Sequence, residues 1–207
     1  MGTRHLIAVY LDGEYKIAQY GQWDGYPEGQ GVSTLAFARE IAAPTARRLF
    51  KEKLRQCRWI TENEIEYINE KIRKGIIEDW TKIYPELDRD TGSDILKMVF
   101  NSKDGMALQN SITFAADSLF CEWAWVIDLD KKTFEGYKGF NTTHPATQED
   151  RFYFLKDEEE KKASERTMSG DSYYCVRLVK SYSLDDLPSD ATFLHDFVSD
   201  DEEEDIT

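Results

Sequence analysis

A tight turn between two strand-like segments, close to the N-terminus, constrains the fold of this 207-residue chain more than any other feature. Residues 5–10 and 15–20 are rich in apolar and aromatic side chains, and Leu11-Asp12-Gly13-Glu14 separates them. Asp-Gly suits a two-residue hairpin turn because both central residues of such a turn need positive φ. The sequence therefore predicts a β-hairpin here, and with it an antiparallel sheet.

The second predicted strand runs directly into loop 20–31, whose composition is unusual. It contains four glycines and Pro27, and between them stand polar and aromatic side chains: Tyr20, Gln22, Trp23, Asp24, Tyr26, Glu28 and Gln30. Glycine lets a backbone approach a ligand closely, and aromatic rings stack on planar groups. The same residues also suit a structural loop that folds back and satisfies its own backbone. Both interpretations stay open at this point.

Helices are predicted next along the chain. Capping residues and helical spacing of apolar side chains indicate helices over 33–41, 44–57, 61–83, 93–100 and 108–119. The third has the strongest signal, because Thr61-Glu62-Asn63-Glu64 is a capping box and isoleucines recur at helical spacing after it.

Strands return in the second half of the chain. Alternating apolar side chains predict strands over 121–127 and 133–137, with Cys121, Trp123, Trp125 and Ile127 on one face of the first. Further strands are predicted over 152–155 and 172–182. Residues 156–170 are charged, which indicates an exposed helix or loop, and 184–197 indicate one or two helical turns. The predicted fold is one α+β domain, residues 1–198, with an antiparallel sheet of five or six strands.

The acidity of the chain is concentrated at its C-terminal end. The net charge is −14, but residues 181–207 contain ten Asp or Glu and no Lys or Arg. Without these ten, 30 acidic and 26 basic residues remain, a net charge of −4 over residues 1–180. No basic stripe marks a nucleic-acid surface, so direct DNA or RNA binding is not expected. Residues 199–207 are predicted to form a disordered acidic tail.

The cysteines and the hydropathy pattern indicate the cellular compartment in which the protein is expected. Cys57, Cys121 and Cys175 lack the spacing of a zinc site or a disulfide framework, so no metal site is predicted and the last two are interpreted as buried hydrophobes. No apolar run reaches the roughly 20 residues that span a bilayer, and no signal-peptide pattern begins the chain. A soluble cytoplasmic protein without a membrane partner is expected.

Several segments of the chain carry a resemblance to a protein family. Gly2-Thr3-Arg4-His5-Leu6 and loop 20–31, with Glu122–Asp128 and the hairpin strand after it, resemble a family of small proteins that share these motifs. The resemblance covers the chain to about residue 140. It implies relatives, but no reaction and no cofactor.

Loop 20–31 is the candidate ligand site, and Arg4 and His5 join it if the hairpin curls over the loop. The leading hypothesis is a small-molecule-binding protein that uses this loop, with an unknown cofactor. One alternative is a hydrolase, in which Asp24 and Glu28 act with Arg4 and His5. In another form of it, Thr3 is an N-terminal nucleophile of the Ntn type after further cleavage. No catalytic residue is assigned.

A third hypothesis gives the acidic tail a function. Residues 200–205 are all Asp or Glu, which suits capture of a basic protein partner as well as simple solvation of the chain end. The sequence does not decide between the two interpretations.

Overall fold

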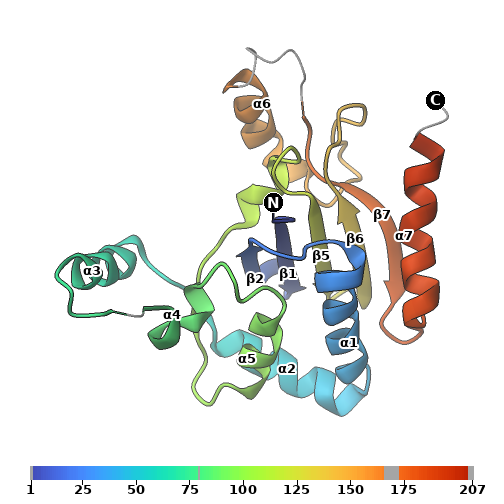
Figure 1. Ribbon diagram of the computed structural model, residues 1–207. Coiled ribbons are helices and arrows are strands. Elements are labelled where there is room, and N and C mark those ends of the chain that lie inside the picture. Colours follow the sequence, from blue (N-terminus) through green and yellow to red (C-terminus); the bar gives the residue numbers. More distant parts are fainter. Residues whose placement is uncertain (1, 79, 166–172, 205–207) are drawn as a thin grey trace.

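The computed structural model describes residues 2–78, 80–165 and 173–204 (Figure 1). Its strands are β1 His5–Leu11, β2 Glu14–Gly21, β3 Arg58–Trp59, β4 Ala107–Leu108, β5 Trp123–Asp128, β6 Thr133–Lys138 and β7 Arg177–Ser183. Its helices are α1 Val32–Glu40, α2 Pro44–Gln56, α3 Glu62–Arg73, α4 Trp80–Ile83, α5 Asp94–Asn101, α6 Lys156–Glu165 and α7 Asp190–Glu204. These elements form the single α+β domain that the sequence predicts.

The main sheet has the strand order β2-β1-β5-β6-β7. All neighbours pair antiparallel except β1 and β5, which are parallel, and β5 is the central strand. The predicted hairpin is confirmed: Val9 lies opposite Ile17, and Asp12 and Gly13 take φ of 56° and 81° in the turn. A separate two-stranded sheet joins β3 to β4 and was not predicted.

Four helices, α1, α2, α5 and α7, cover one face of the main sheet. Their apolar side chains form one core with the odd-numbered positions of β1 and β5. Trp125 is fully buried there and stacks on Trp123, with ring centroids 5.6 Å apart, and Ile127 belongs to the same core, as predicted. Cys121 was predicted on this face too, but it precedes β5 and is buried on the opposite face of the sheet, so that part of the prediction was wrong. Figure 1 shows α7 running along β7 at one side of the sheet, while α3 and α4 lie apart at the other.

A smaller core covers the opposite face of the sheet. It joins the even-numbered positions of β1 and β5 to the 3-10 turns Ile112–Ala116 and Tyr153–Leu155. Cys121 and Cys175 are buried in this core, as predicted.

The helix predicted over residues 61–83 is shorter in the structure. Its capping box is present, since the Thr61 hydroxyl accepts from the Glu64 amide and the Glu64 carboxylate accepts from the Thr61 amide. The helix ends at Arg73 because Gly75 takes a left-handed φ of 66° and its amide donates back to the Ile72 carbonyl. The isoleucines keep helical spacing beyond Gly75, and this spacing led to the prediction of one long helix. That prediction was wrong.

Two further predictions were wrong. Residues 108–119 form no long helix, because the Ser111 amide donates to the Ala18 carbonyl of β2 and draws the segment along the sheet edge. Residues 153–155 form a 3-10 turn rather than a strand, and this turn buries Phe152 and Leu155 on the same side. In both cases the apolar run is short, so the spacing of its apolar side chains does not distinguish a helix from a strand.

The boundaries of two helices also differ from the expected ones. Helix α1 begins at Val32 directly after a π-helical turn at Pro27–Gly31, so Ser33 lies inside the helix rather than at its cap. Helix α7 is longer than one or two turns and extends to Glu204, through most of the segment predicted as a disordered tail. Residues 205–207 lie outside the described part.

None of the helices in the described ranges is both long and apolar enough to cross a membrane.

Candidate functional site

The glycines of the predicted loop let its backbone lie directly on buried side chains. A Cβ added at Gly21 would lie 2.1 Å from ring atoms of His5, and one at Gly25 would lie 2.7 Å from the His5 Cβ. A Cβ at Gly31 would lie 2.8 Å from the indole ring of Trp125. Packing alone therefore requires glycine at these three positions.

Backbone hydrogen bonds fix the same inner side of the loop. The Gly25 amide donates to the Thr3 carbonyl at 2.9 Å, and the buried indole Nε1 of Trp125 donates to the Gly25 carbonyl at 2.9 Å. The Gln30 amide closes the loop by donating to the Asp24 carbonyl at 2.8 Å. The inner side of the loop is thus a structural support that ties β1 to β5.

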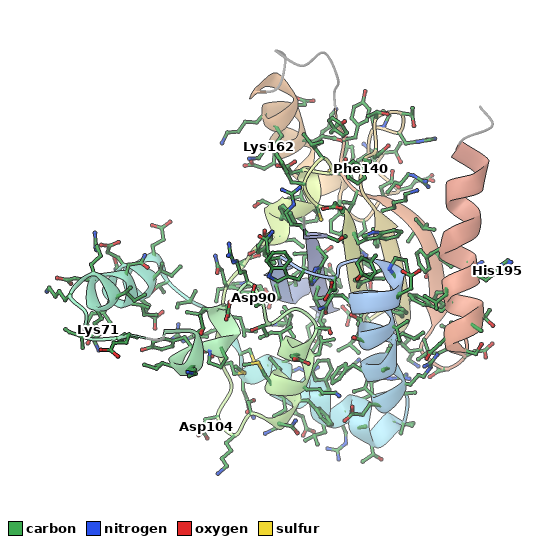
Figure 2. All side chains as sticks on the ribbon, in the orientation of Figure 1. Lys71, Asp90, Asp104, Phe140, Lys162 and His195 are labelled. Carbon is green, nitrogen blue, oxygen red and sulfur yellow. The ribbon has the colours of Figure 1, made fainter. Side chains whose placement is uncertain are left out.

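Residues 88–93 contact the loop from outside and hold it by hydrogen bonds. They were not predicted from the sequence to belong to the site. The Gln22 amide donates to the Arg89 carbonyl, and the Ser93 amide donates to the Gln30 side chain. The Trp23 indole donates to Asp90 at 2.8 Å, and Figure 2 marks Asp90 on the segment that leads into α5. No local pattern could have revealed these partners, since about 67 residues separate Trp23 from Asp90 in the chain.

One group of predicted site residues points to solvent. Trp23 is 46% exposed and Tyr26 is 39% exposed, and Asp24 and Glu28 are exposed beside them in the chain. The Tyr26 hydroxyl donates to Asp24 at 3.2 Å, and this bond raises the pKa of Tyr26. We call these four residues, with Asp90, the outer face of the loop.

The other predicted residues lie elsewhere, so the structure does not gather all nine around one pocket. Tyr20 of β2 packs on Phe114 of the 3-10 turn Ile112–Ala116 and donates to Gln22 at 2.6 Å. It borders a separate cavity of about 340 Å³. Arg4 places its guanidinium 4.5 Å from the ring of Phe120 and pairs with Glu122. These residues are therefore not part of the outer face.

His5 lies beneath the loop and is only 1% exposed. Neither ring nitrogen has a hydrogen-bond partner within the described residues, and no hydrogen bond joins His5 to Asp24 or Glu28 there. Burial lowers the pKa of His5 to about 4, against the opposing effects of the Thr3 carbonyl and the Asp24 carboxylate. The geometry therefore offers no acid–base pair for the hydrolase alternative.

The buried imidazole makes stability depend on pH. Its folded pKa of about 4 lies below the ordinary value of 6.5, so the unfolded chain takes up the proton first as the pH falls. The stability associated with a neutral His5 is therefore fully present above about pH 6.5 and is lost as the pH falls from 6.5 to 4. We expect His5 to lower the free energy of unfolding by about 2 kcal/mol between pH 7 and pH 5.

Urea unfolding at the two pH values measures this loss. His5→Gln should reduce the difference between pH 7 and pH 5, whereas His195→Gln, at an exposed position on α7, should leave it unchanged. An imidazole of His5 that titrates near pH 6.5 by NMR contradicts the prediction.

Within the described ranges, no three His, Cys, Asp or Glu side chains gather in a way that could hold a metal ion. Comparison with family models, with curated proteins and with solved structures finds no match for this chain. The resemblance carried by residues 2–6 and 20–31 stays a prediction, and the function is inferred from the geometry of the site.

Proposed function

We propose that the protein binds a small, planar, positively charged molecule on the outer face of loop 20–31. The observation that carries this proposal is the exposure of Trp23 and Tyr26, whose polar atoms are held by Asp90 and Asp24. Two aromatic side chains in fixed positions thus face solvent, and packing and hydrogen bonds hold the inner side of the same loop in place. A binding surface that is already ordered loses little entropy when a ligand arrives.

The charge of the outer face favours a cation. Asp24, Glu28 and Asp90 place three carboxylates beside the two aromatic residues. The guanidinium of Arg89 lies 3.9 Å from Asp90 and offsets one of them, so Asp24 and Glu28 leave this face with a net negative charge. An indole or phenol ring attracts a cation over its face by about 0.5–2 kcal/mol. The same carboxylates repel phosphate groups, so nucleotides fit this face poorly.

We also propose that the protein works in the cytoplasm. Cys57, Cys121 and Cys175 are all unpaired in the structure, which suits a reducing compartment. Capture of a basic protein by the acidic residues after 199 is a further, independent proposal that truncation before residue 199 tests.

Titration with 1-methylquinolinium tests the function, with quinoline as the uncharged ring of similar shape. We expect the cation to bind more tightly than quinoline, and Trp23→Ala to weaken its binding at least about tenfold, a loss of about 1.4 kcal/mol. Tyr67→Ala is the matched control, because Tyr67 is an exposed aromatic residue on α3, away from the loop. Calorimetry measures all four affinities.

Two outcomes contradict the proposal. One is quinoline binding as tightly as the cation, and the other is an affinity that Trp23→Ala leaves unchanged. Trp23→Ala must also remain folded without ligand, and we expect it to lose less than about 1.5 kcal/mol of stability because the indole is half exposed. Unfolding of this variant in plain buffer would show that the outer face is structural as well.

A further inference from the structure

A second pocket lies on the opposite side of the sheet from α1 and α2 and does not involve loop 20–31. It has a volume of about 450 Å³ and opens between the β1–β2 turn, the β5–β6 turn and residues 151–154. Its lining includes Tyr10, Tyr15, Asp128, Lys131, Arg151 and Phe154. None of these residues was predicted from the sequence to belong to a site.

The floor of the pocket holds a buried guanidinium. The Arg151 side chain is 8% exposed, and its Nε and Nη2 donate to the two oxygens of Glu135 at 2.6 and 2.9 Å. Nη2 also donates to Asp128, whose side chain is fully buried. Three nearly buried charges thus meet beneath the pocket.

Both carboxylates are fully engaged, so the guanidinium has one fixed orientation. Glu135 also accepts from the hydroxyls of Tyr137 and Thr133, and Asp128 accepts from the amides of residues 130 and 131. The hydrogen bonds from Arg151 to other described residues all start from Nε or Nη2, so Nη1 takes part in none of them. The Tyr15 hydroxyl, which the charge of Arg151 influences, is buried beside it without a hydrogen-bond partner among the described residues. The floor therefore keeps a donor group unused and held in place.

Aromatic rings form the walls. The guanidinium of Arg151 lies 5.5 Å from the ring of Tyr10, and Tyr15 stands between Tyr10 and Phe154 at centroid distances of 5.0 and 5.9 Å. Phe154 is 58% exposed, so one face of its ring is free for contact. A flat ring inserted here would contact aromatic carbon on its sides.

The charges of the pocket nearly cancel. Asp128 and Glu135 outnumber Arg151 by one, and Lys131 restores the balance at the mouth, where Glu14 pairs with Lys16. A phosphate or a second carboxylate would meet no net positive charge, while an uncharged oxygen can still accept from a fixed N–H.

We propose that this pocket binds a small planar ring bearing an uncharged carbonyl group, as in an aromatic amide or lactam. The carbonyl oxygen accepts from Nη1 of Arg151, and the ring lies against Tyr10 and Phe154. This site is independent of the function proposed for loop 20–31, since the two share no residue.

Benzamide is the probe, and ligand-observed NMR suits the millimolar affinity expected of so small a molecule. We expect benzamide to bind more tightly than toluene, which lacks the carbonyl, and more tightly than benzoate, which is charged. Phe154→Ala should weaken the binding of benzamide at least about fivefold, because it removes one wall of the site. Phe140→Ala is the matched control, since Phe140 is a similarly exposed phenylalanine outside the pocket (Figure 2).

Each contrary result overturns a stated part of the proposal. No benzamide binding at 10 mM (roughly ten times the expected Kd) rules out the site, and equal loss in both phenylalanine variants places the probe elsewhere. Benzoate binding as tightly as benzamide shows that the ligand class is wrong. Toluene binding as tightly shows that Arg151 does not donate a hydrogen bond to the carbonyl oxygen.

Discussion

Replacing Arg151 with methionine should lower the free energy of unfolding by about 3–5 kcal/mol, the usual loss when one partner of a buried ion pair is removed. Asp128 is 1% exposed and Glu135 is 5% exposed, and both contact this one guanidinium. Urea unfolding of wild type and variant measures the difference.

The cost arises from the charges left behind. Burial alone would raise the pKa of Glu135, but hydrogen bonds and the charge of Arg151 outweigh burial and hold that pKa below its ordinary value. Without Arg151, both carboxylates must stay ionised in a poorly solvated place or take up protons. The variant should therefore recover stability as the pH falls, in contrast to wild type.

Two further variants separate this cause from general damage. Adding Asp128→Asn and Glu135→Gln to Arg151→Met should restore most of the loss, because no buried charge is then unpaired. Arg48→Met, which breaks the exposed pair with Glu52 on α2, should cost less than about 0.5 kcal/mol. A loss below about 1 kcal/mol for Arg151→Met would mean that solvent reaches the cluster.

The parts of the fold that were predicted correctly depend on short-range chemistry. The Asp12-Gly13 turn and the Thr61 capping box are specified by residues within four positions of one another. The end of α3 at Gly75 was available in the sequence too, but the isoleucine spacing beyond it suggested a longer helix. The parallel pairing of β1 with β5 joins residues over 100 positions apart, so no local pattern could predict it.

The candidate sites likewise combine features that a local pattern predicts with contacts that exist only in the folded chain. Composition identified loop 20–31 but could not tell its two sides apart, because this depends on where His5 and Trp125 lie. Trp23 was predicted, whereas Asp90 was not, since their contact exists only in the folded chain. The Arg151 cluster draws its charges from two strands and a later turn, each of which contributes one charged side chain.

Gly21→Ala should cost about 3 kcal/mol, at the upper end of what one added methyl costs in a well-packed interior. The new Cβ would lie 2.1 Å from Cε1 and Nε2 of His5, and this ring cannot move aside easily. His5 is the first residue of β1 and lies opposite Gly21, and Gly25 packs against its Cβ. We expect the substitution to lower the free energy of unfolding and to loosen loop 20–31, which hydrogen exchange of the Gly25 amide would report.

A double-variant cycle shows whether the imidazole is the cause. In a His5→Ala background the ring is gone, and Gly21→Ala should then cost less than about 1 kcal/mol, a coupling of roughly 2 kcal/mol between the two positions. Gly75→Ala is the control for glycine itself: its Cβ would meet no atom within 4 Å, so its cost should reflect only the left-handed φ of 66°, about 1–2 kcal/mol, in both backgrounds. If Gly21→Ala costs the same with and without the histidine, then the loop does not depend on the contact between Gly21 and His5, and the structural role assigned to its inner side is wrong.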